Sequence, residues 1–193
     1  MLILNMYITA FPVILAGILN MVFTKTKIYR KYKFPIDGNI LLADGKRLFG
    51  ENKTWIGFAS MILFCMGTQL VWGSILKFSG IDFHNELYHL YENKFPYNLL
   101  IGAFLGLAYM LLELPNSFIK RRLDIEPGKT KTTMVGLMFF LIDQIDSMIG
   151  VAAVIYIFSE ISFMKYLGYI ALGGVTHIMV NLILYKLKVR RNL

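Results

Sequence analysis

Cysteine is almost absent from this chain of 193 residues, which contains a single thiol at Cys65. One cysteine supports neither a disulfide framework nor a thiolate metal site, so Cys65 is expected to be a small core residue. Acidic residues are also few, with 12 Asp and Glu against 20 Lys and Arg, and the formal net charge is +8. The chain has no internal repeat, no heptad array and no low-complexity segment.

Long polar segments that would form a soluble domain are missing as well. Hydrophobic residues make up 56% of the chain, and the mean hydropathy is +0.58. A helix needs about 20 apolar residues to cross about 30 Å of hydrocarbon. Windows of that kind occupy residues 3–23, 55–76, 97–114, about 134–158 and 166–185. The sequence therefore predicts a single all-α integral membrane domain over residues 1–193, with five transmembrane helices.

The first window has a second interpretation, which is a secretory signal peptide. No basic segment precedes this apolar run and no small-residue cleavage site follows it. Residues 1–23 are therefore expected to remain as a transmembrane helix.

Basic residues are unevenly distributed among the connecting segments. Only Lys77, Lys94 and Lys165 fall in the two segments that five alternating spans place opposite the others. Because Lys and Arg concentrate in cytoplasmic loops, the N-terminus is predicted to be outside and the C-terminus cytoplasmic. The loops at about 24–54 and 115–133 are then cytoplasmic. Topology and attraction to anionic lipid head groups account for most of the charge, and binding to nucleic acid is not expected.

The first of these loops combines glycines with cations over residues 44–57. Glycines permit a tight backbone, and cations can contact phosphate. The segment is not a Walker A loop, because its glycines are wrongly spaced from the Lys-Thr pair and no strand precedes it. On composition alone, a charged loop next to the membrane, ended by the interfacial Trp55, is the simpler interpretation.

The second loop carries a run of three cations. Pro115 is expected to end or kink the third span, and Ser117 to cap a short helix whose first turns contain Lys120, Arg121 and Arg122. Arginine offers a planar fork for bidentate phosphate contacts and lysine a mobile point charge, so the run suits a polyphosphate ligand. The alternative is that it serves only as a topology signal.

Two carboxylates follow in the fourth window, at Asp143 and Asp146. An aspartate at the bilayer centre costs about 2.5 to 3.5 kcal/mol, so this pair needs a metal, a partner or water. Spaced i and i+3, the two share one helix face and can hold a hard cation such as Mg²⁺ through oxygen. Salt bridges to Lys or Arg inside the bundle are the alternative. The fourth span begins either near residue 134 or near 143, and the later start would bring the pair close to cytoplasmic water.

Together these segments resemble a known family. The pattern from Asp44-Gly-Lys-Arg to Lys53-Thr-Trp-Ile-Gly57, and that from Ser117-Phe-Ile-Lys-Arg-Arg122 to Asp143-Gln-Ile-Asp146, are similar to the CDP-archaeol synthase branch of the CDP-diacylglycerol synthase (phosphatidate cytidylyltransferase) family. The resemblance implies an enzyme of phospholipid synthesis that transfers a cytidylyl group from CTP to a lipid phosphate, giving a CDP-lipid and pyrophosphate. It also implies a plasma (cytoplasmic) membrane location with the active site facing the cytoplasm.

The same resemblance assigns roles to residues. Asp143 and Asp146 are expected to hold Mg²⁺, with Glu113 as an additional ligand, and Lys120, Arg121 and Arg122 to bind the lipid phosphate or the leaving pyrophosphate. The remaining predicted substrate-binding residues, mostly in the first loop, are Asp44, Lys46, Arg47, Asn52, Lys53, Thr54 and Ser117.

Several alternatives remain open at this point. The lipid phosphate can be an archaeal ether lipid or another lipid, the site can hold one metal or two, and the oligomeric state is undetermined, a homodimer being one arrangement. A small membrane transporter or channel that uses an intramembrane acidic pair is the alternative function. The clustering of the basic loops on one side argues against it.

Overall fold

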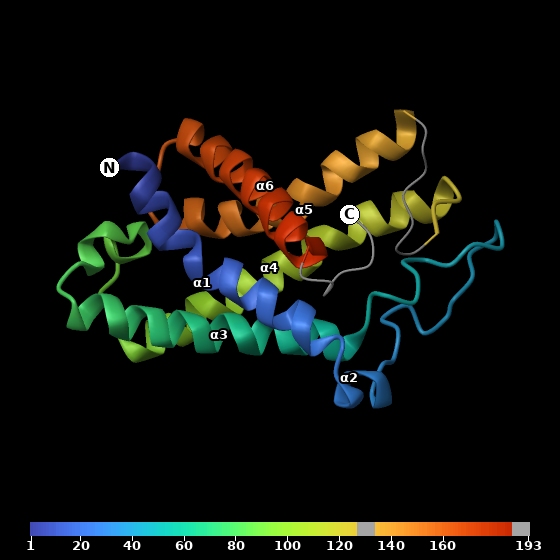
Figure 1. Cartoon of the computed structure of the whole chain (residues 1–193), viewed down its shortest axis with the longest axis horizontal. Helices are drawn as coiled ribbons and strands as arrows, with labels where there is room; N and C mark the ends of the chain where they lie inside the picture. The colour runs from blue at the N-terminus through green and yellow to red at the C-terminus, as the bar shows by residue number, and fades with distance from the viewer. Residues whose placement is uncertain (127–133, 187–193) are drawn as a thin grey trace.

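Five long helices make up most of the computed structural model, which describes residues 1–126 and 134–186. Each is long and apolar enough to cross a membrane. They are α1 (Leu2–Phe23), α3 (Trp55–Phe78), α4 (Phe95–Arg122), α5 (Met134–Phe158) and α6 (Phe163–Lys186). The predicted all-α fold with five membrane-spanning helices is confirmed (Figure 1).

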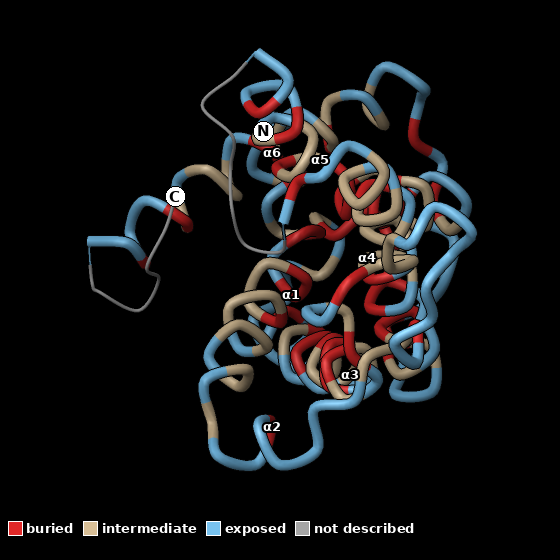
Figure 2. Tube along the Cα trace, turned by 90° about the vertical axis from the view of Figure 1, so that its right-hand side faces the viewer, coloured by how far each residue is buried: buried red, intermediate tan, exposed pale blue. Residues whose placement is uncertain are grey.

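The exposed surface of these helices is apolar, as contact with lipid requires. Figure 2 shows buried residues where helices face one another and exposed residues around the outside. Large side chains such as Leu63, Val71, Ile157 and Met164 are mostly exposed, whereas small residues such as Ala16 and Ala152 are fully buried. Because lipid tails are as apolar as a protein core, the helices associate mainly through close packing.

Glycines bring α3 and α4 into direct backbone contact. A Cβ placed on Gly102 would lie 2.7 Å from Cα of Met66, and one on Gly106 would lie 2.7 Å from Cα of Ile62. No L side chain fits at such distances, so the small residues in this helix permit the close approach. The backbones of α3 and α4 therefore pack against each other at these two positions.

The third span is longer than predicted. Pro115 lies inside α4, which continues without a break to Arg122, so Ser117 does not cap a separate helix and the predicted second loop begins only after residue 122. Proline is tolerated in membrane helices where neighbouring groups satisfy the freed backbone. Lys120, Arg121 and Arg122 therefore occupy the last turn of α4, where the helix dipole favours cations.

The fourth span begins at Met134, the earlier of the two alternatives, and α5 runs unbroken through Asp143 and Asp146. In Figure 1 the first part of α5 leans away from the end of α4. Residues 127–133 of the predicted second loop and the basic tail over 187–193 lie outside the described residues.

At one end of the bundle, the segment between α3 and α4 folds inward. It contains two short 3₁₀ turns, η1 (Asp82–His84) and η2 (Glu86–Tyr88). Glu86 is fully buried, pairs with Lys165 of α6 and accepts a hydrogen bond from the Tyr169 hydroxyl at 2.8 Å. These contacts replace hydration of the carboxylate and fasten the turn to the bundle.

The opposite end carries the first loop, the end of α4 and the start of α5 (Figure 1). The loop starts with the short helix α2 (Lys27–Lys31) and continues to Thr54, with isolated bridges pairing Pro35 with Thr54 and Leu41 with Arg47. The first loop thus lies at the same end of the bundle as the described part of the predicted second loop, up to residue 126. Which side of the membrane this end faces remains a prediction.

Candidate active site

A polar cavity of about 210 Å³ lies at this end, between the first loop, α4 and α5. It brings together segments that are separated by about 90 positions in the chain and become neighbours only when the bundle folds. Its lining consists of Phe49, Asn52, Lys53, Glu113, Asn116, Ser117, Lys120, Arg121, Asp143 and Asp146. We refer to it below as the charged cavity.

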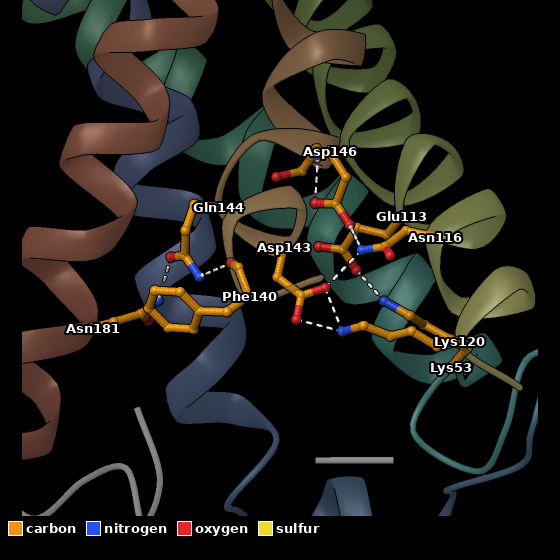
Figure 3. A network of polar contacts seen from close by, with 10 residues as sticks. Lys53, Glu113, Asn116, Lys120, Phe140, Asp143, Gln144, Asp146 and Asn181 are labelled. Atoms are coloured by element: carbon orange, nitrogen blue, oxygen red, sulfur yellow. Dashed lines mark hydrogen bonds and ion pairs between the residues drawn. The ribbon is translucent and has the colours of Figure 1, made fainter. Parts of the chain in front are cut away.

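Asn116 joins the two aspartates of α5. Its side-chain amide donates to Oδ1 of Asp143 at 2.6 Å and to Oδ2 of Asp146 at 2.7 Å (Figure 3). The other carboxylate oxygen of Asp146 accepts from the backbone N–H of Ser147 at 2.7 Å. The pair thus faces α4 with its oxygens converging on one amide, as the shared helix face predicted.

Two lysines complete the ion pairs of the cavity. Lys120 contacts both oxygens of Asp143, and Lys53 from the first loop pairs with Glu113 of α4 (Figure 3). The lining therefore carries three carboxylates, on Glu113, Asp143 and Asp146, and three cations, on Lys53, Lys120 and Arg121. The salt bridge that the sequence offered as the alternative to metal binding is present for Asp143, with Lys120, whereas Asp146 is bound by Asn116 and the Ser147 backbone. The formal charges of the lining cancel.

Lys53 is charged at neutral pH. Burial by itself would lower the pKa of its ammonium, but the attraction of Glu113, followed by that of Asp146 and Asp143, raises the pKa above its usual value. The ammonium is thus a permanent cation between the loop and the two helices.

The basic run of α4 is divided between two roles. Lys120 and Arg121 line the charged cavity, and the Nε of Arg121 is buried without a hydrogen-bond partner among the described residues. Arg122 points to the first loop, where it donates to both oxygens of Asp44 at 2.8 and 2.9 Å and to the carbonyl of Arg47. Arg122 therefore connects α4 to the loop and does not line the cavity.

A buried carboxylate organises the first loop. Asp37 is 2% exposed, binds the guanidinium of Arg47 and accepts from the backbone N–H groups of Phe49 and Gly50 at 3.2 and 2.9 Å. Burial opposes ionisation, but the hydrogen bonds from Arg47 and the backbone lower the pKa of Asp37 to about 2. This anchor places the segment that leads to Asn52 and Lys53.

The predicted substrate-binding residues are therefore of two kinds. Asn52, Lys53 and Ser117 line the cavity. The other four hold the loop in place. Three of them form ion pairs, which are Asp44–Arg122, Lys46–Asp124 and Arg47–Asp37. The fourth, Thr54, caps α3 and hydrogen-bonds the Tyr29 hydroxyl. In the structure without substrate, none of those four lines the charged cavity.

A second cavity, of about 310 Å³, adjoins the first. It shares Asn52, Lys53 and Glu113 with the charged cavity and extends between α1, α3 and α4 as far as His177 of α6. A smaller cavity of about 60 Å³, with mainly apolar lining, continues from there past Tyr109 between α1 and α6. We refer to the 310 Å³ space as the inner cavity.

Two site residues were missed from sequence. Asn116 sits between Pro115 and Ser117, and its polar side chain in an apolar span was the available signal. Asp37 had no such signal, because its role depends on loop backbone groups 12 and 13 positions away. Asn181 of α6 donates to Gln144 of α5 at 3.1 Å, which is a hydrogen bond between helices.

The bundle places a cavity with charges of both signs next to an inner cavity that leads to a mainly apolar pocket, an arrangement suited to a membrane enzyme that acts on an amphipathic substrate. The particular family is shown by comparison: the CarS-like CDP-archaeol synthase family model matches residues 1–192, and the chain belongs to that family.

Individual relatives agree with this assignment. The chain is similar to the CDP-archaeol synthase of Methanocaldococcus jannaschii, with 28% identity over 81% of each chain. It is also similar to that of Sulfurisphaera tokodaii, with 32% identity over 81% of this chain and 79% of the relative. A solved intramembrane enzyme for archaeal membrane lipid biosynthesis has the same fold, with a TM-score of 0.56, 22% identity, and coverage of 91% of this chain and 92% of that one.

These findings confirm the predicted family and the prediction of a membrane enzyme of the lipid cytidylyltransferase class. The transporter or channel alternative has no support from them.

Proposed function

We propose that this enzyme transfers the cytidylyl group of CTP to a membrane lipid phosphate, releasing pyrophosphate, and that archaeol phosphate is its substrate. The lipid is inferred from the relatives, which are CDP-archaeol synthases. The observation that carries the proposal is the charged cavity, where three carboxylates face three cations beside an inner cavity that leads to an apolar pocket in the bundle.

The reaction forms a bond between a lipid phosphate oxygen and the α-phosphorus of CTP and breaks the bond to the β-phosphate, so pyrophosphate leaves. A phosphate monoester has a second pKa near 6, which makes the nucleophile largely anionic at pH 7 without a general base. The obstacle is repulsion between anions. Catalysis then consists of positioning and neutralisation, for which Lys53, Lys120 and Arg121 are placed.

The residues present fit a hard cation. Asn116 Oδ1 is buried and has no hydrogen-bond partner among the described residues, and it belongs to the side chain that joins Asp143 and Asp146. Carboxylate and amide oxygens are the donors that Mg²⁺ prefers. Asp143 and Asp146 would hold the ion, with Glu113 on the same cavity wall, and when bound it would neutralise charge on the triphosphate.

We assign the two substrates to the two cavities. The charged cavity suits the triphosphate, since it is polar and carries the aspartates. The inner cavity suits the lipid, because it runs from Lys53 between membrane helices toward an apolar pocket. The two phosphates would then meet at the wall that both cavities share.

We further infer that this end of the bundle faces the cytoplasm of a plasma membrane, because CTP is a cytoplasmic nucleotide and Lys and Arg concentrate here.

The test is direct. Purified protein receives CTP labelled in its α-phosphate, Mg²⁺ and, in separate reactions, archaeol phosphate, a diacylglycerol phosphate or no lipid. We expect label in the lipid extract with archaeol phosphate and none without lipid. Label that stays in the aqueous phase with every lipid, from protein that elutes as a folded species, would exclude this function.

A further inference from the structure

Lys53 and Glu113 form the wall between two cavities. Both line the charged cavity and the inner cavity, and they contact each other across the boundary. The pair is largely buried, with 20% of the Lys53 side chain and 19% of the Glu113 side chain exposed. With substrates assigned to either side, this ion pair stands between them.

We propose that Lys53 is an exchangeable counter-ion. It neutralises Glu113 while the cavities are empty, and it moves to substrate phosphate when they fill, which opens the wall and frees Glu113. The proposal rests on the proposed function. It makes Lys53 a residue that contacts substrate, and Glu113 the residue that pairs with Lys53 until substrate binds.

Three observations support the exchange. Lys53 lies in the last loop residues before the α3 cap Thr54, so its flexible stem can turn toward either cavity. Its ammonium is attracted by all three carboxylates of the site, with Glu113 strongest. Releasing Lys53 would leave Glu113 buried and unpaired unless a cation replaces it, so loss of Lys53 from Glu113 and arrival of a cation should be linked.

This linkage predicts that Lys53 and Glu113 each weaken the binding of a different ligand. Lys53 competes with a divalent cation for Glu113, and Glu113 competes with phosphate for Lys53. Removing either side chain should therefore strengthen the binding of the ligand that it opposes, even where turnover falls. A side chain that only supports the fold would strengthen neither.

The cation arm uses Mn²⁺ alone, followed by electron paramagnetic resonance in the absence of nucleotide. Lys53→Met should tighten Mn²⁺ binding by about tenfold, equivalent to about 1.4 kcal/mol. Lys94→Met is the matched control, because Lys94 forms an exposed pair with Glu92 at the other end of the bundle, and it should leave Mn²⁺ binding unchanged. Unchanged or weaker binding in Lys53→Met would overturn the exchange.

The anion arm uses inorganic pyrophosphate in excess EDTA, measured by calorimetry. Glu113→Gln keeps size and removes charge, so it should tighten pyrophosphate binding by about tenfold. This arm also serves if Lys53→Met does not fold. Weaker pyrophosphate binding in folded Glu113→Gln would show that Glu113 is only a support.

A charge-conserving variant distinguishes the proposed movement of Lys53 from an effect of its positive charge alone. Lys53→Arg keeps the positive charge but can hold a carboxylate through two parallel hydrogen bonds, which makes release harder. We expect intact folding, unchanged Mn²⁺ affinity or weaker, and an apparent Michaelis constant for lipid phosphate raised about tenfold. Wild-type kinetics in this variant would overturn the exchange. Since both binding arms omit CTP and lipid, their failure is distinguishable from failure of cytidylyl transfer in the wild type.

Discussion

Asn116 sets the geometry of the aspartate pair, because one amide group donates to both carboxylates. Two like charges so close together would repel each other without it and without the ammonium of Lys120. Two ion pairs, Lys120 with Asp143 and Lys53 with Glu113, cross the cavity. Under the proposed function, these pairs change partners when substrate and cation bind.

The first prediction concerns Asp143 and Asp146. Asp143→Asn and Asp146→Asn keep size and remove one charge each, and each should lower kcat by about two orders of magnitude, in line with losing about 3 kcal/mol of electrostatic stabilisation. The measurement is the labelled CTP assay with and without EDTA. Glu92→Gln, in an exposed pair at the other end, is the control. Near-normal turnover in either aspartate variant would remove it from the catalytic machinery.

The two arginines at the end of α4 should respond differently to substitution by lysine. Arg121 lines the charged cavity, so Arg121→Lys should cost about tenfold in kcat/KM, about 1.4 kcal/mol, because an ammonium cannot reproduce the planar fork. Arg122 binds Asp44 outside the cavity, so Arg122→Lys should mainly loosen the first loop. Steady-state kinetics together with trypsin sensitivity of the loop separate the two. Equal kinetic losses would contradict the division of the run.

Sequence motifs identified most of these residues without showing which of them line the cavity. Lys120, Arg121, Asp143 and Asp146 stood out because charge inside an apolar chain is costly. Asp44, Lys46, Arg47 and Thr54 carry the same motif, but their structural partners are as far as 78 positions away along the chain. A pattern of residue types shows which residues belong together and leaves undetermined which of them face the cavity.

The first loop has little regular structure beyond α2, and its buried carboxylate, Asp37, is bound by Arg47 and by backbone N–H groups of the loop itself. The pKa of Asp37 is lowered to about 2 in the folded protein from 3.8, so its stabilising contribution is fully present above about pH 4 and is lost as the pH falls through 2. We expect pepsin to cut the loop increasingly fast over that range, and less steeply in Asp37→Asn.

At neutral pH the same substitution should open the loop. Asp37→Asn loses the ion pair with Arg47, and trypsin should cleave near Lys46 and Arg47 about tenfold faster than in wild type, since local opening sets the rate. Glu51→Gln, at an exposed position of the same loop, is the matched control. Equal protection in Asp37→Asn would show that another contact anchors the loop.

Helix spans could be predicted closely because hydropathy measures transfer into lipid, which decides insertion. The end of α4 could not be predicted, because Pro115 normally disfavours a continuing helix. Here the residues after it reach partners on α5, with Asn116 and Lys120 both bound to Asp143, and those tertiary contacts retain the helix. Local propensity is a weak guide wherever such partners exist.

At the scale of the whole molecule, the two ends of the bundle carry different arrangements of polar residues. One end contains Glu86, Lys165 and Tyr169 in a buried cluster, and the other carries the charged cavity beneath the first loop. Under the proposed function, the nucleotide and the lipid meet at the end with the charged cavity. Its orientation in the membrane therefore decides whether the enzyme can reach CTP.

The last prediction tests that orientation with cysteine labelling. The only native cysteine, Cys65, is fully buried, so it should give little background. Leu90→Cys places a thiol at a position 47% exposed at the end that contains Glu86, and Leu41→Cys places one at a position 61% exposed in the first loop. In intact cells an impermeant maleimide should label Leu90→Cys alone, and both variants should be labelled after the membrane is opened. Labelling of Leu41→Cys in intact cells would show that the first loop and the charged cavity lie on the side without nucleotide. The uneven distribution of Lys and Arg would then not have determined the orientation of the protein.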